Sequence, residues 1–389
     1  MSDLIRRDGI AKGWAALPAS EVRPMALEAE PSVLVISTVT TPGSVSGTLT
    51  GGDPDAFVSF SLAEGGEPEH GTVTVETYGT YTYTPDPGYE GSDSFTFAIV
   101  NEAGETATAT VAITVAAEPL LVIDGSQGND VLIGGTGDNI IEGLGGYDIL
   151  LGGLGNDLLT LGASGYADGG EGDDTLTSGS GYSELYGGDG DDTITFGEGS
   201  GYAFGEAGND TLTGGAEGDR LFGNEGNDTI TLVDSGYAYG DAGNDTLTGG
   251  AGGDGLYGGT GIDQITAGAG DDTVSFADLD AGDFADGGAG SDTLSVYGTT
   301  ITDPIVLAGG ELFLDGLLVA TGFESFDIAA GSSDDTLTGG AGYSELYGGD
   351  GDDTISLGEG GGYASGEAGS DTLTGGIASD SLNGGIGSD

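Results

Sequence analysis

The chain has 389 residues, and its 5 Lys+Arg against 66 Asp+Glu give a formal net charge of −61. A charge this negative repels phosphate backbones and anionic lipids, which argues against nucleic acid and membrane insertion and favours cations as ligands. Cysteine is absent and His70 is the single histidine, so disulfides, thiolate metal sites and two-histidine zinc sites are excluded. The 84 glycines are too many for ordinary helical domains.

The N-terminal third contains two compositionally different segments. Residues 1–34 hold four of the five basic residues, and we expect a leader or anchor segment there, for which disorder is one option. Residues 35–117 alternate polar and apolar or β-branched side chains, as in GTVTVET and GTYTYTPDPG, with Gly, Pro and Asp between the runs. This pattern predicts an antiparallel β-sandwich, in which we expect His70 to be an ordinary surface residue. Residues 118–124 are expected to be a linker.

The segment 35–117 resembles the cadherin-like, immunoglobulin-like repeats of large bacterial surface proteins. That resemblance implies a spacer or adhesive module and no particular chemistry. It covers this segment only.

From Gly125 to the end, the chain repeats every nine residues, as in GGEGDDTLT (169–177) and GGDGDDTIT (187–195). The motif divides into a first block over 125–295 and a second block over 330–389, which stops at the sixth position of a repeat and is expected to be uncapped. Residues 296–329 lose the motif but keep strand character. We expect them to add irregular strands to the same solenoid.

This nonapeptide resembles the calcium-binding repeat of RTX (repeats-in-toxin) proteins. Its glycines permit tight turns with exposed carbonyl groups, its sixth-position aspartate adds a carboxylate, and its last three residues form a short strand. Calcium takes six to eight oxygen ligands, so two turns stacked at strand spacing would share each ion. The sequence therefore predicts an all-β chain, an N-terminal antiparallel β-sandwich followed by a long parallel β-roll of about 13 coils, with multiple Ca²⁺ ions.

Alternate repeats stack on the same side of such a roll, which separates the aspartates into two rows. One row contains aspartates 17 or 18 residues apart, which are candidate calcium ligands: Asp157, Asp174, Asp192, Asp210, Asp228, Asp245 and Asp263, continued by Asp335, Asp353, Asp371 and Asp389. The opposite row is eroded, and its candidate ligands are Asp130, Asp148, Asp254, Asp272 and Asp292. The repeats at Asp219 and Asp380 fit the motif less well. The inward aliphatic residues that follow the first row are expected to form a thin core.

Tyrosines occupy the eroded turns instead, at Tyr166, Tyr182, Tyr202, Tyr237, Tyr343 and Tyr363. Two interpretations remain open. The row is either a contact face for a partner, or a stack of rings that replaces lost calcium as packing.

The function expected from these features is structural. The chain lacks the HExxH, G-x-S-x-G and G-x-x-x-x-G-K-[ST] motifs, so we expect no enzyme. The RTX resemblance implies type I secretion, an extracellular or cell-surface location, and a surface-layer, biofilm-matrix or adhesin role. Aspartates about 5 Å apart repel by about 0.8 kcal/mol even in water, so we expect the roll to fold on binding extracellular calcium.

The expected partners are calcium and further copies of the chain, in a homo-oligomer or surface lattice. Two alternatives stay open. The chain is an RTX export and stability module separated from a catalytic domain, or a glycan-binding adhesin whose partner is a cell-surface glycan.

Overall fold

The computed structural model describes residues 36–40, 44–49, 58–86, 89, 91–101, 106–116, 120–215, 218–277, 279–297 and 301–389. The expected leader over 1–34 lies outside the described residues. The chain forms two compact units, Met1–Pro119 and Leu120–Asp389, which we describe separately. The described residues form strands and turns, and none of them belongs to a helix able to cross a membrane.

The first unit consists of two small sheets. Its strands are β1 (Ile36–Thr40), β2 (Val45–Thr48), β3 (Val58–Leu62), β4 (Gly71–Val75), β5 (Thr80–Pro85), β6 (Gly91–Asn101) and β7 (Thr106–Ala116). One sheet has the order β1-β7-β6-β3 and the other β2-β5-β4, and every pairing is antiparallel except that of β1 with β7. Tyr81 and Tyr83 from one sheet share a core with Phe95 and Phe97 from the other. This confirms the predicted antiparallel β-sandwich.

A buried carboxylate, Asp93, fixes the loop before β4. It accepts the N–H groups of Glu69 and His70, each at 3.0 Å, and the Tyr83 hydroxyl at 2.9 Å. Burial acts to raise the pKa of Asp93, but these hydrogen bonds outweigh it and hold the pKa below its ordinary value. The His70 ring stacks on Tyr89 with centroids 4.1 Å apart. His70 is therefore half-buried and part of the packing, rather than a free surface histidine.

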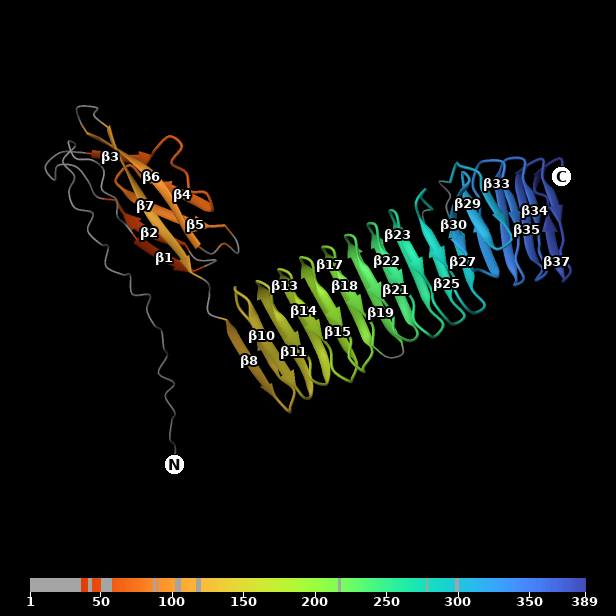
Figure 1. Cartoon of the computed structure of the whole chain (residues 1–389), viewed down its shortest axis with the longest axis horizontal. Helices are drawn as coiled ribbons and strands as arrows, with labels where there is room; N and C mark the ends of the chain where they lie inside the picture. The colour runs from red at the N-terminus through yellow and green to blue at the C-terminus, as the bar shows by residue number, and fades with distance from the viewer. Residues whose placement is uncertain are drawn as a thin grey trace. The chain divides into compact units, whose positions relative to one another are not determined.

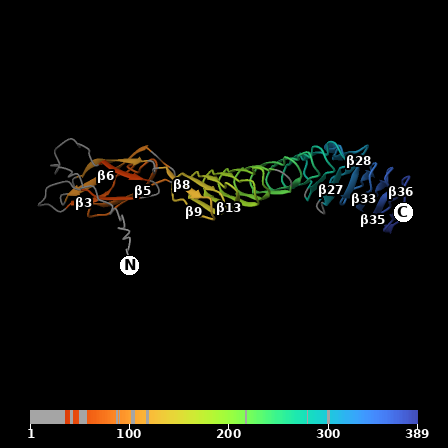
Figure 2. The ribbon, with the colours of Figure 1, turned by 90° about the horizontal axis from the view of Figure 1, so that it is seen from below.

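The second unit is a parallel β-solenoid of about 14 turns with two sheets, shown in Figures 1 and 2. The threonine sheet, named for its outward side chains, contains β8 (Leu121–Ser126), β10 (Asn139–Leu144), β12 (Leu158–Thr160), β14 (Thr175–Thr177), β16 (Thr193–Thr195), β18 (Thr211–Thr213), β20 (Thr229–Thr231), β22 (Thr246–Thr248), β24 (Gln264–Thr266), β26 (Phe284–Asp286), β28 (Ile305–Ala308), β29 (Glu311–Leu314), β30 (Leu317–Thr321), β32 (Thr336–Thr338), β34 (Thr354–Ser356) and β36 (Thr372–Thr374).

The second sheet of the solenoid carries outward aromatic rings, and we call it the aromatic sheet. It contains β9 (Val131–Ile133), β11 (Tyr147–Leu154), β13 (Ser164–Glu171), β15 (Ser183–Asp189), β17 (Gly201–Ala207), β19 (Asp219–Glu225), β21 (Gly236–Ala242), β23 (Gly255–Thr260), β25 (Thr273–Phe276), β27 (Thr293–Tyr297), β31 (Ser325–Ala329), β33 (Ser344–Asp350), β35 (Gly362–Gly369), β37 (Asp380–Asn383) and β38 (Ile386–Gly387). The predicted long parallel β-roll is thereby confirmed.

A single file of aliphatic side chains fills each sheet's inner face. The parallel register of the threonine sheet aligns the side chains of this file, and each is at most 1 % exposed. The file contains Leu159, Leu176, Ile194, Leu212, Ile230, Leu247 and Ile265. Because side chains alternate along a strand, the residues on either side of each aliphatic point outward. The core is therefore thin, as expected.

The segment between the two repeat blocks stays inside the solenoid. On the aromatic sheet, β27 pairs directly with β31. On the threonine sheet, β28, β29 and β30 form an antiparallel meander in which β30 pairs with β26 and β28 pairs with β32. This meander supplies a further coil, which explains why the solenoid has about one turn more than the repeat count predicts.

Candidate metal centre

The turns that lead into the threonine sheet carry the first row of aspartates, and we call them the ladder turns. At most of them, the aspartate Oδ1 accepts the backbone N–H of the aspartate one coil earlier, whereas Asp157 Oδ1 accepts the Asn139 N–H and Asp335 Oδ1 accepts the Ile305 N–H. The N–H of Asp174 donates to Asp192 over 2.7 Å, and that of Asp192 to Asp210 over 2.7 Å. The same bond joins the pairs 157–174, 210–228, 228–245, 245–263, 335–353, 353–371 and 371–389. One oxygen of each carboxylate, Oδ1, is thus already occupied by a hydrogen bond that joins adjacent coils.

The other oxygen, Oδ2, has no hydrogen-bond partner in most of these turns. In the ladder turns, fully buried, unpartnered Oδ2 atoms belong to Asp157, Asp174, Asp192, Asp210, Asp228, Asp245, Asp263, Asp335, Asp353 and Asp371. In the opposite turns they belong to Asp148, Asp272 and Asp292. A buried polar atom without a partner costs free energy, and a buried charge costs far more unless it is compensated. A regular row of such atoms indicates a row of positions for cations.

Most of these Oδ2 atoms border a small space beside a glycine that a Cβ would fill. A Cβ added to Gly187 would collide with Asp192 Oδ2 and would lie 2.8 Å from the carbonyl oxygen of Gly205 in the next coil. The arrangement repeats at Gly205, where the added Cβ would meet Asp210 Oδ2 and the carbonyl oxygen of Gly223. A carboxylate oxygen and a carbonyl oxygen from adjacent coils therefore converge at six ladder turns, beside Gly152, Gly169, Gly187, Gly205, Gly223 and Gly240.

The buried carboxylates are poorly tolerated as anions without a cation. Burial raises the pKa of Asp174 to about 7, of Asp192 to about 8 and of Asp210 to about 7, and neighbouring aspartate charges add to the effect. Burial likewise raises the pKa of Asp263 to about 7 and of Asp335 to about 6. At neutral pH these turns therefore gain from a positive ion.

The donor set fits calcium. It consists of carboxylate and carbonyl oxygens, the hard ligands that Ca²⁺ and Mg²⁺ take, and calcium tolerates the irregular geometry of ligands drawn from two turns better than magnesium does. Among the described residues, no three acidic side chains converge on one point. Each ion would therefore take two carboxylates at most and would complete its shell with backbone carbonyls.

Four aspartates of the opposite turns behave differently, because their Oδ2 atoms are satisfied within their own turns. Asp219 Oδ2 accepts the Gly215 N–H at 2.6 Å. Asp254, Asp380 and Asp130 accept the N–H four residues earlier, each at 2.7 Å. These carboxylates close a turn without a metal ion. Two of the predicted ligands, Asp130 and Asp254, belong to this group, and their ligation stays a prediction.

The remaining predicted ligands lie where the spacing places them. On the opposite turns the N–H of Asp130 donates to Asp148 Oδ1 at 3.0 Å, and that of Asp254 to Asp272 Oδ1 at 2.8 Å. The N–H of Asp272 donates to Asp292 Oδ1 at 2.9 Å. Of the full predicted set, Asp130 is half-buried and Asp389 is exposed, and the others are buried.

Sequence reasoning missed two carboxylates that continue these rows. Asp283 Oδ1 accepts the Asp263 N–H at 2.8 Å, and Glu324 Oε2 accepts the Asp292 N–H at 3.0 Å. Asp283 follows Asp263 by 20 residues instead of 18, but the run DFAD still shows an aspartate two positions before a small apolar residue. That signal was available, whereas nothing in the repeat motif indicates Glu324.

A second, exposed ladder binds the coils in the opposite direction. In most ladder turns the residue before the aspartate is Asp or Asn. Its side-chain oxygen accepts the N–H one coil later, as the Asp191 N–H donates to Asp173 at 3.0 Å and the Asn209 N–H to Asp191 at 2.7 Å. Asn227 and Asn244 extend the series. The two ladders together hold each coil from both sides.

The tyrosines of the opposite turns do not form one continuous stack. In the parallel register, Glu184 lies between Tyr166 and Tyr202, and Arg220 lies between Tyr202 and Tyr237. The Arg220 guanidinium lies 5.5 and 5.4 Å from the two ring centroids that flank it. In the second block Tyr363 packs on Tyr347, while Tyr343 is exposed.

A continuous stack does exist, two residues further along each strand. Tyr186, Phe204, Phe222, Tyr239 and Tyr257 lie nearly parallel, with successive centroids 4.6–4.8 Å apart. We call this file the aromatic ladder. Three of its five coils carry Ser183, Gly201 and Gly236 in place of the aspartate, and the other two carry Asp219 and Asp254, whose Oδ2 atoms accept a backbone N–H. Stacked rings therefore accompany turns without an unpartnered carboxylate oxygen.

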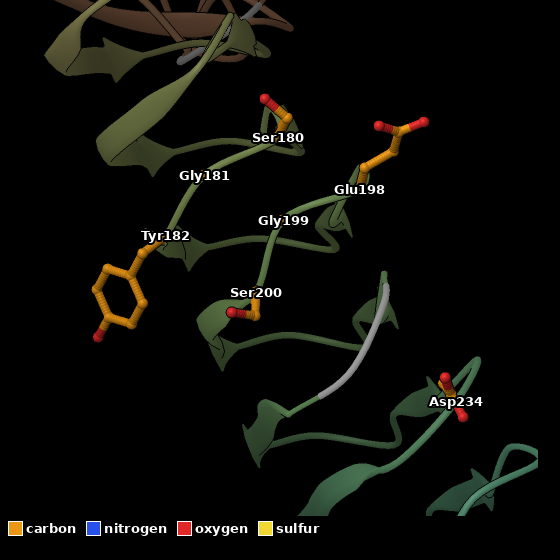
Figure 3. A pocket seen from close by; sticks show the side chains of 7 residues that line it. All are labelled: Ser180, Gly181, Tyr182, Glu198, Gly199, Ser200 and Asp234. Carbon is orange, nitrogen blue, oxygen red and sulfur yellow. The ribbon is translucent and has the colours of Figure 1, made fainter.

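A surface cavity of about 400 Å³ lies over these eroded turns (Figure 3). It is lined by Ser180, Gly181, Tyr182, Glu198, Gly199, Ser200 and Asp234. Its groups are hydroxyls, two carboxylates and one aromatic ring, and it is separate from the ladder turns.

Comparison with known families decides the identity of the repeats. The family model of the RTX calcium-binding nonapeptide repeat matches residues 124–159, 168–203, 204–232, 237–256, 254–278, 330–364 and 358–389, together more than half of the chain. The chain belongs to the RTX repeat family. The bacterial Ig domain model matches residues 24–114 of this RTX protein. Its solenoid is an RTX calcium-binding β-roll, a type of module typical of secreted bacterial proteins.

The wider comparisons add little. No curated protein sequence matches this RTX protein. One solved structure that matches is an endo-fucoidan hydrolase of glycoside hydrolase family 107, at 19% identity and a TM-score of 0.19, over 23% of this chain and 13% of the hydrolase. A likeness this slight carries no argument about fold or function.

Proposed function

We propose that this RTX protein is a secreted structural protein of the cell surface, without enzymatic activity, whose β-roll folds when it binds extracellular calcium. The observation that carries the proposal is the row of buried, unpartnered Oδ2 atoms, six of which lie beside a carbonyl oxygen of the next coil. Asp157, Asp174, Asp192, Asp210, Asp228, Asp245, Asp263, Asp335, Asp353 and Asp371 are the principal ligands in this proposal.

Calcium binding and folding are coupled in this account. The ligand oxygens come from different coils, so the unfolded chain has no preformed site and the binding free energy becomes folding free energy. A net charge of −61 also favours expansion of the chain when no cation is bound. In calcium-poor cytosol the chain stays unfolded and suited to type I export, and millimolar calcium outside the cell folds it.

The structural role follows from the pairing of an Ig-type sandwich with a long roll, two modules that serve as spacers and adhesive supports. We place the protein in a surface layer, a biofilm matrix or an adhesin. Calcium also lowers the repulsion between acidic copies, which supports assembly into a homo-oligomer or lattice. Sedimentation in calcium, against magnesium at equal ionic strength, tests this assembly. Monomers at all concentrations in calcium would count against it.

Cell fractionation tests the location and role. We expect whole producing cells to carry the protein on their surface, and a wash with a calcium chelator to release it. Protein found only in the cytoplasm, or unaffected by the chelator, would contradict the proposal.

Glycan binding at the surface cavity is a second candidate function. The cavity combines the Tyr182 ring with the Ser180 and Ser200 hydroxyls and the carboxylates of Glu198 and Asp234 (Figure 3). An aromatic ring with a few polar groups is the usual composition of a small-molecule site. A glycan screen with the wild type and Tyr182→Ala tests it, and equal binding by both would exclude this cavity.

A further inference from the structure

We propose that the segment between the two repeat blocks completes a calcium site of its own, formed by Asp292, Glu324 and the carbonyl oxygen of Gly322. This inference rests on the proposed calcium binding by the repeats. Asp292 and Glu324 lie between the two stretches that match the repeat family, residues 254–278 and 330–364. The ligand contributed by the insert is a glutamate, which the repeat motif does not contain.

Glu324 takes the place of the next aspartate in the row of opposite turns. The Asp272 N–H donates to Asp292 Oδ1 at 2.9 Å, and the Asp292 N–H donates in turn to Glu324 Oε2 at 3.0 Å. The N–H groups of Glu324 and Ser325 both donate to the Asp292 carbonyl oxygen, at 3.1 and 3.0 Å. The chain thus leaves the row at Asp292 and returns to it 32 residues later with a carboxylate in the same position.

The space beside these two carboxylates is built like a ladder turn. Asp292 is fully buried, and its Oδ2 has no hydrogen-bond partner. A Cβ added to Gly287 would lie 2.5 Å from the Gly322 carbonyl oxygen and 3.0 Å from the Asp292 Cβ. In a regular repeat, a Cβ added to Gly187 would likewise lie close to a carbonyl oxygen of the next coil, that of Gly205, although its nearest atom would be Asp192 Oδ2.

The exchange of aspartate for glutamate has a geometric reason. In a repeat, five positions separate the first glycine from its aspartate, as from Gly187 to Asp192, whereas two positions separate Gly322 from Glu324. The shorter loop leaves the backbone in a different place, and the additional methylene of glutamate lets the carboxylate reach the ladder. Gly322 has φ of +80°, a left-handed conformation that suits glycine and turns its carbonyl toward Gly287.

An ion at this position would join the two repeat blocks. Asp292 directly precedes β27 and Glu324 directly precedes β31, the strands that pair across the insert. Two carboxylates held together by one backbone hydrogen bond repel each other, and an ion between them converts that repulsion into attraction. The docking of β28–β30 between the blocks would then depend on calcium.

Native mass spectrometry of the full chain in calcium tests the site by counting bound ions. We compare the wild type with Glu324→Gln, which keeps an oxygen acceptor for the Asp292 N–H but removes the charge. Glu311→Gln is the matched control, because it removes the same charge from an exposed position in the same insert. We expect Glu324→Gln to lose one ion, and Glu311→Gln to lose none.

Hydrogen exchange in the same variants provides a local measurement. In calcium, the amides of 305–321 should exchange faster in Glu324→Gln than in the wild type, while those of β14–β24 stay protected. An unchanged ion count with unchanged exchange would overturn the inference. Loss of several ions at once would also overturn it, because Glu324 would then support the whole solenoid rather than one site. A wild type that binds no calcium would instead refute the proposed function itself.

Discussion

Two kinds of aspartate, identical in the repeat motif, differ in what their second oxygen contacts. Asp210 and its equivalents leave Oδ2 buried and unpartnered, whereas Asp219 uses Oδ2 to accept the Gly215 N–H. The first kind has an unmet requirement for positive charge. In the second kind a backbone N–H compensates part of the charge on Oδ2, although burial still raises the pKa of Asp219. The same residue type in the same motif therefore has two roles.

Neutral substitutions should separate these roles. Asp219→Asn loses a hydrogen bond to a charged group, which costs about 1.5–3 kcal/mol of unfolding free energy, with or without calcium. Asp210→Asn removes an ion ligand, so it should reduce stability in calcium at neutral pH. It should not do so in chelator at pH 5, where the metal-free solenoid is expected to fold and where the Asp210 carboxyl, whose pKa burial raises to about 7, is already protonated. Urea unfolding of both variants under these two conditions measures this. Equal calcium dependence in the two variants would refute the distinction.

The first glycine of a ladder turn should be as sensitive as the aspartate. In Gly187→Ala the new Cβ enters the space between Asp192 Oδ2 and the Gly205 carbonyl oxygen, and Gly187 has no left-handed φ that would add backbone strain. We expect a loss of about 1–3 kcal/mol, as for overpacking, together with weaker calcium binding by calorimetry. Gly128→Ala is the control, since its nearest atom is 3.6 Å away. Normal calcium binding by Gly187→Ala would argue against an ion in this space.

At the scale of elements, the two sheets of the solenoid are stabilised differently. The turns entering the threonine sheet keep their aspartates through almost every coil. Those entering the aromatic sheet have Ser183, Gly201 and Gly236 instead in three of the five coils that the aromatic ladder spans. Stacked rings add about 0.5–1.5 kcal/mol per pair beyond their burial. The aromatic ladder therefore offers calcium-independent cohesion where ions are absent.

Removing one ring should weaken the solenoid equally in calcium at neutral pH and in chelator at pH 5, where the metal-free solenoid is expected to fold. Phe222 lies between Phe204 and Tyr239, with centroids 4.8 and 4.6 Å away. Phe222→Leu keeps an apolar side chain but loses two stacking contacts, so we expect a loss of about 1–3 kcal/mol in thermal or urea unfolding. Tyr343→Leu, at an exposed position with no ring contact among the described residues, should have little effect. A loss confined to calcium would contradict the account.

The sequence predicted the elements whose signal is periodic. Asp174 and Asp192 lie where an 18-residue coil places them, and Leu176 and Ile194 form the core. The hydrogen bond from the Gly215 N–H to Asp219 Oδ2 could not be predicted, because it depends on the backbone geometry of the turn that precedes Asp219. The aromatic ladder had a signal, an aromatic residue before the first glycine of successive coils, as Phe204 before Gly205, but the tyrosines nearer the turns obscured it.

Glu324 marks the limit of prediction from the motif. Its position in the row depends on how 32 residues of insert fold and return, and that long-range register leaves no local trace in the sequence. The same holds for Asp283, whose spacing departs from the repeat by two residues.

At the scale of the whole molecule, the metal-free solenoid should be more stable in acid. The unfolded aspartates have an ordinary pKa of 3.8, but burial raises the folded pKa of Asp174 to about 7 and of Asp192 to about 8. Between those values the folded state binds more protons than the unfolded state, so stability falls as pH rises. The stabilisation of the folded state by these protonated aspartates is complete below pH 3.8 and is lost as pH rises through about 7 to 8.

Calcium should reverse this dependence. The ion requires the ionised carboxylates, so its binding releases protons and strengthens as pH rises from 5 to 8. Circular dichroism in chelator across this range should show β structure increasing toward pH 5, and calorimetry in two buffers should detect proton release on calcium binding. Metal-free β content that increases toward pH 8 would contradict the assignment of the buried carboxylates.

The central claim is that calcium binding folds the β-roll. Far-UV circular dichroism of the full chain during a calcium titration at neutral pH, with magnesium as the control, tests it most directly. We predict a cooperative transition from a largely unfolded solenoid to β structure in calcium, and none in magnesium at the same concentration. A solenoid that is fully β-structured in chelator would contradict the account, since the core, the aromatic ladder and the turns would then suffice and the aspartate row would be a solvated acidic face.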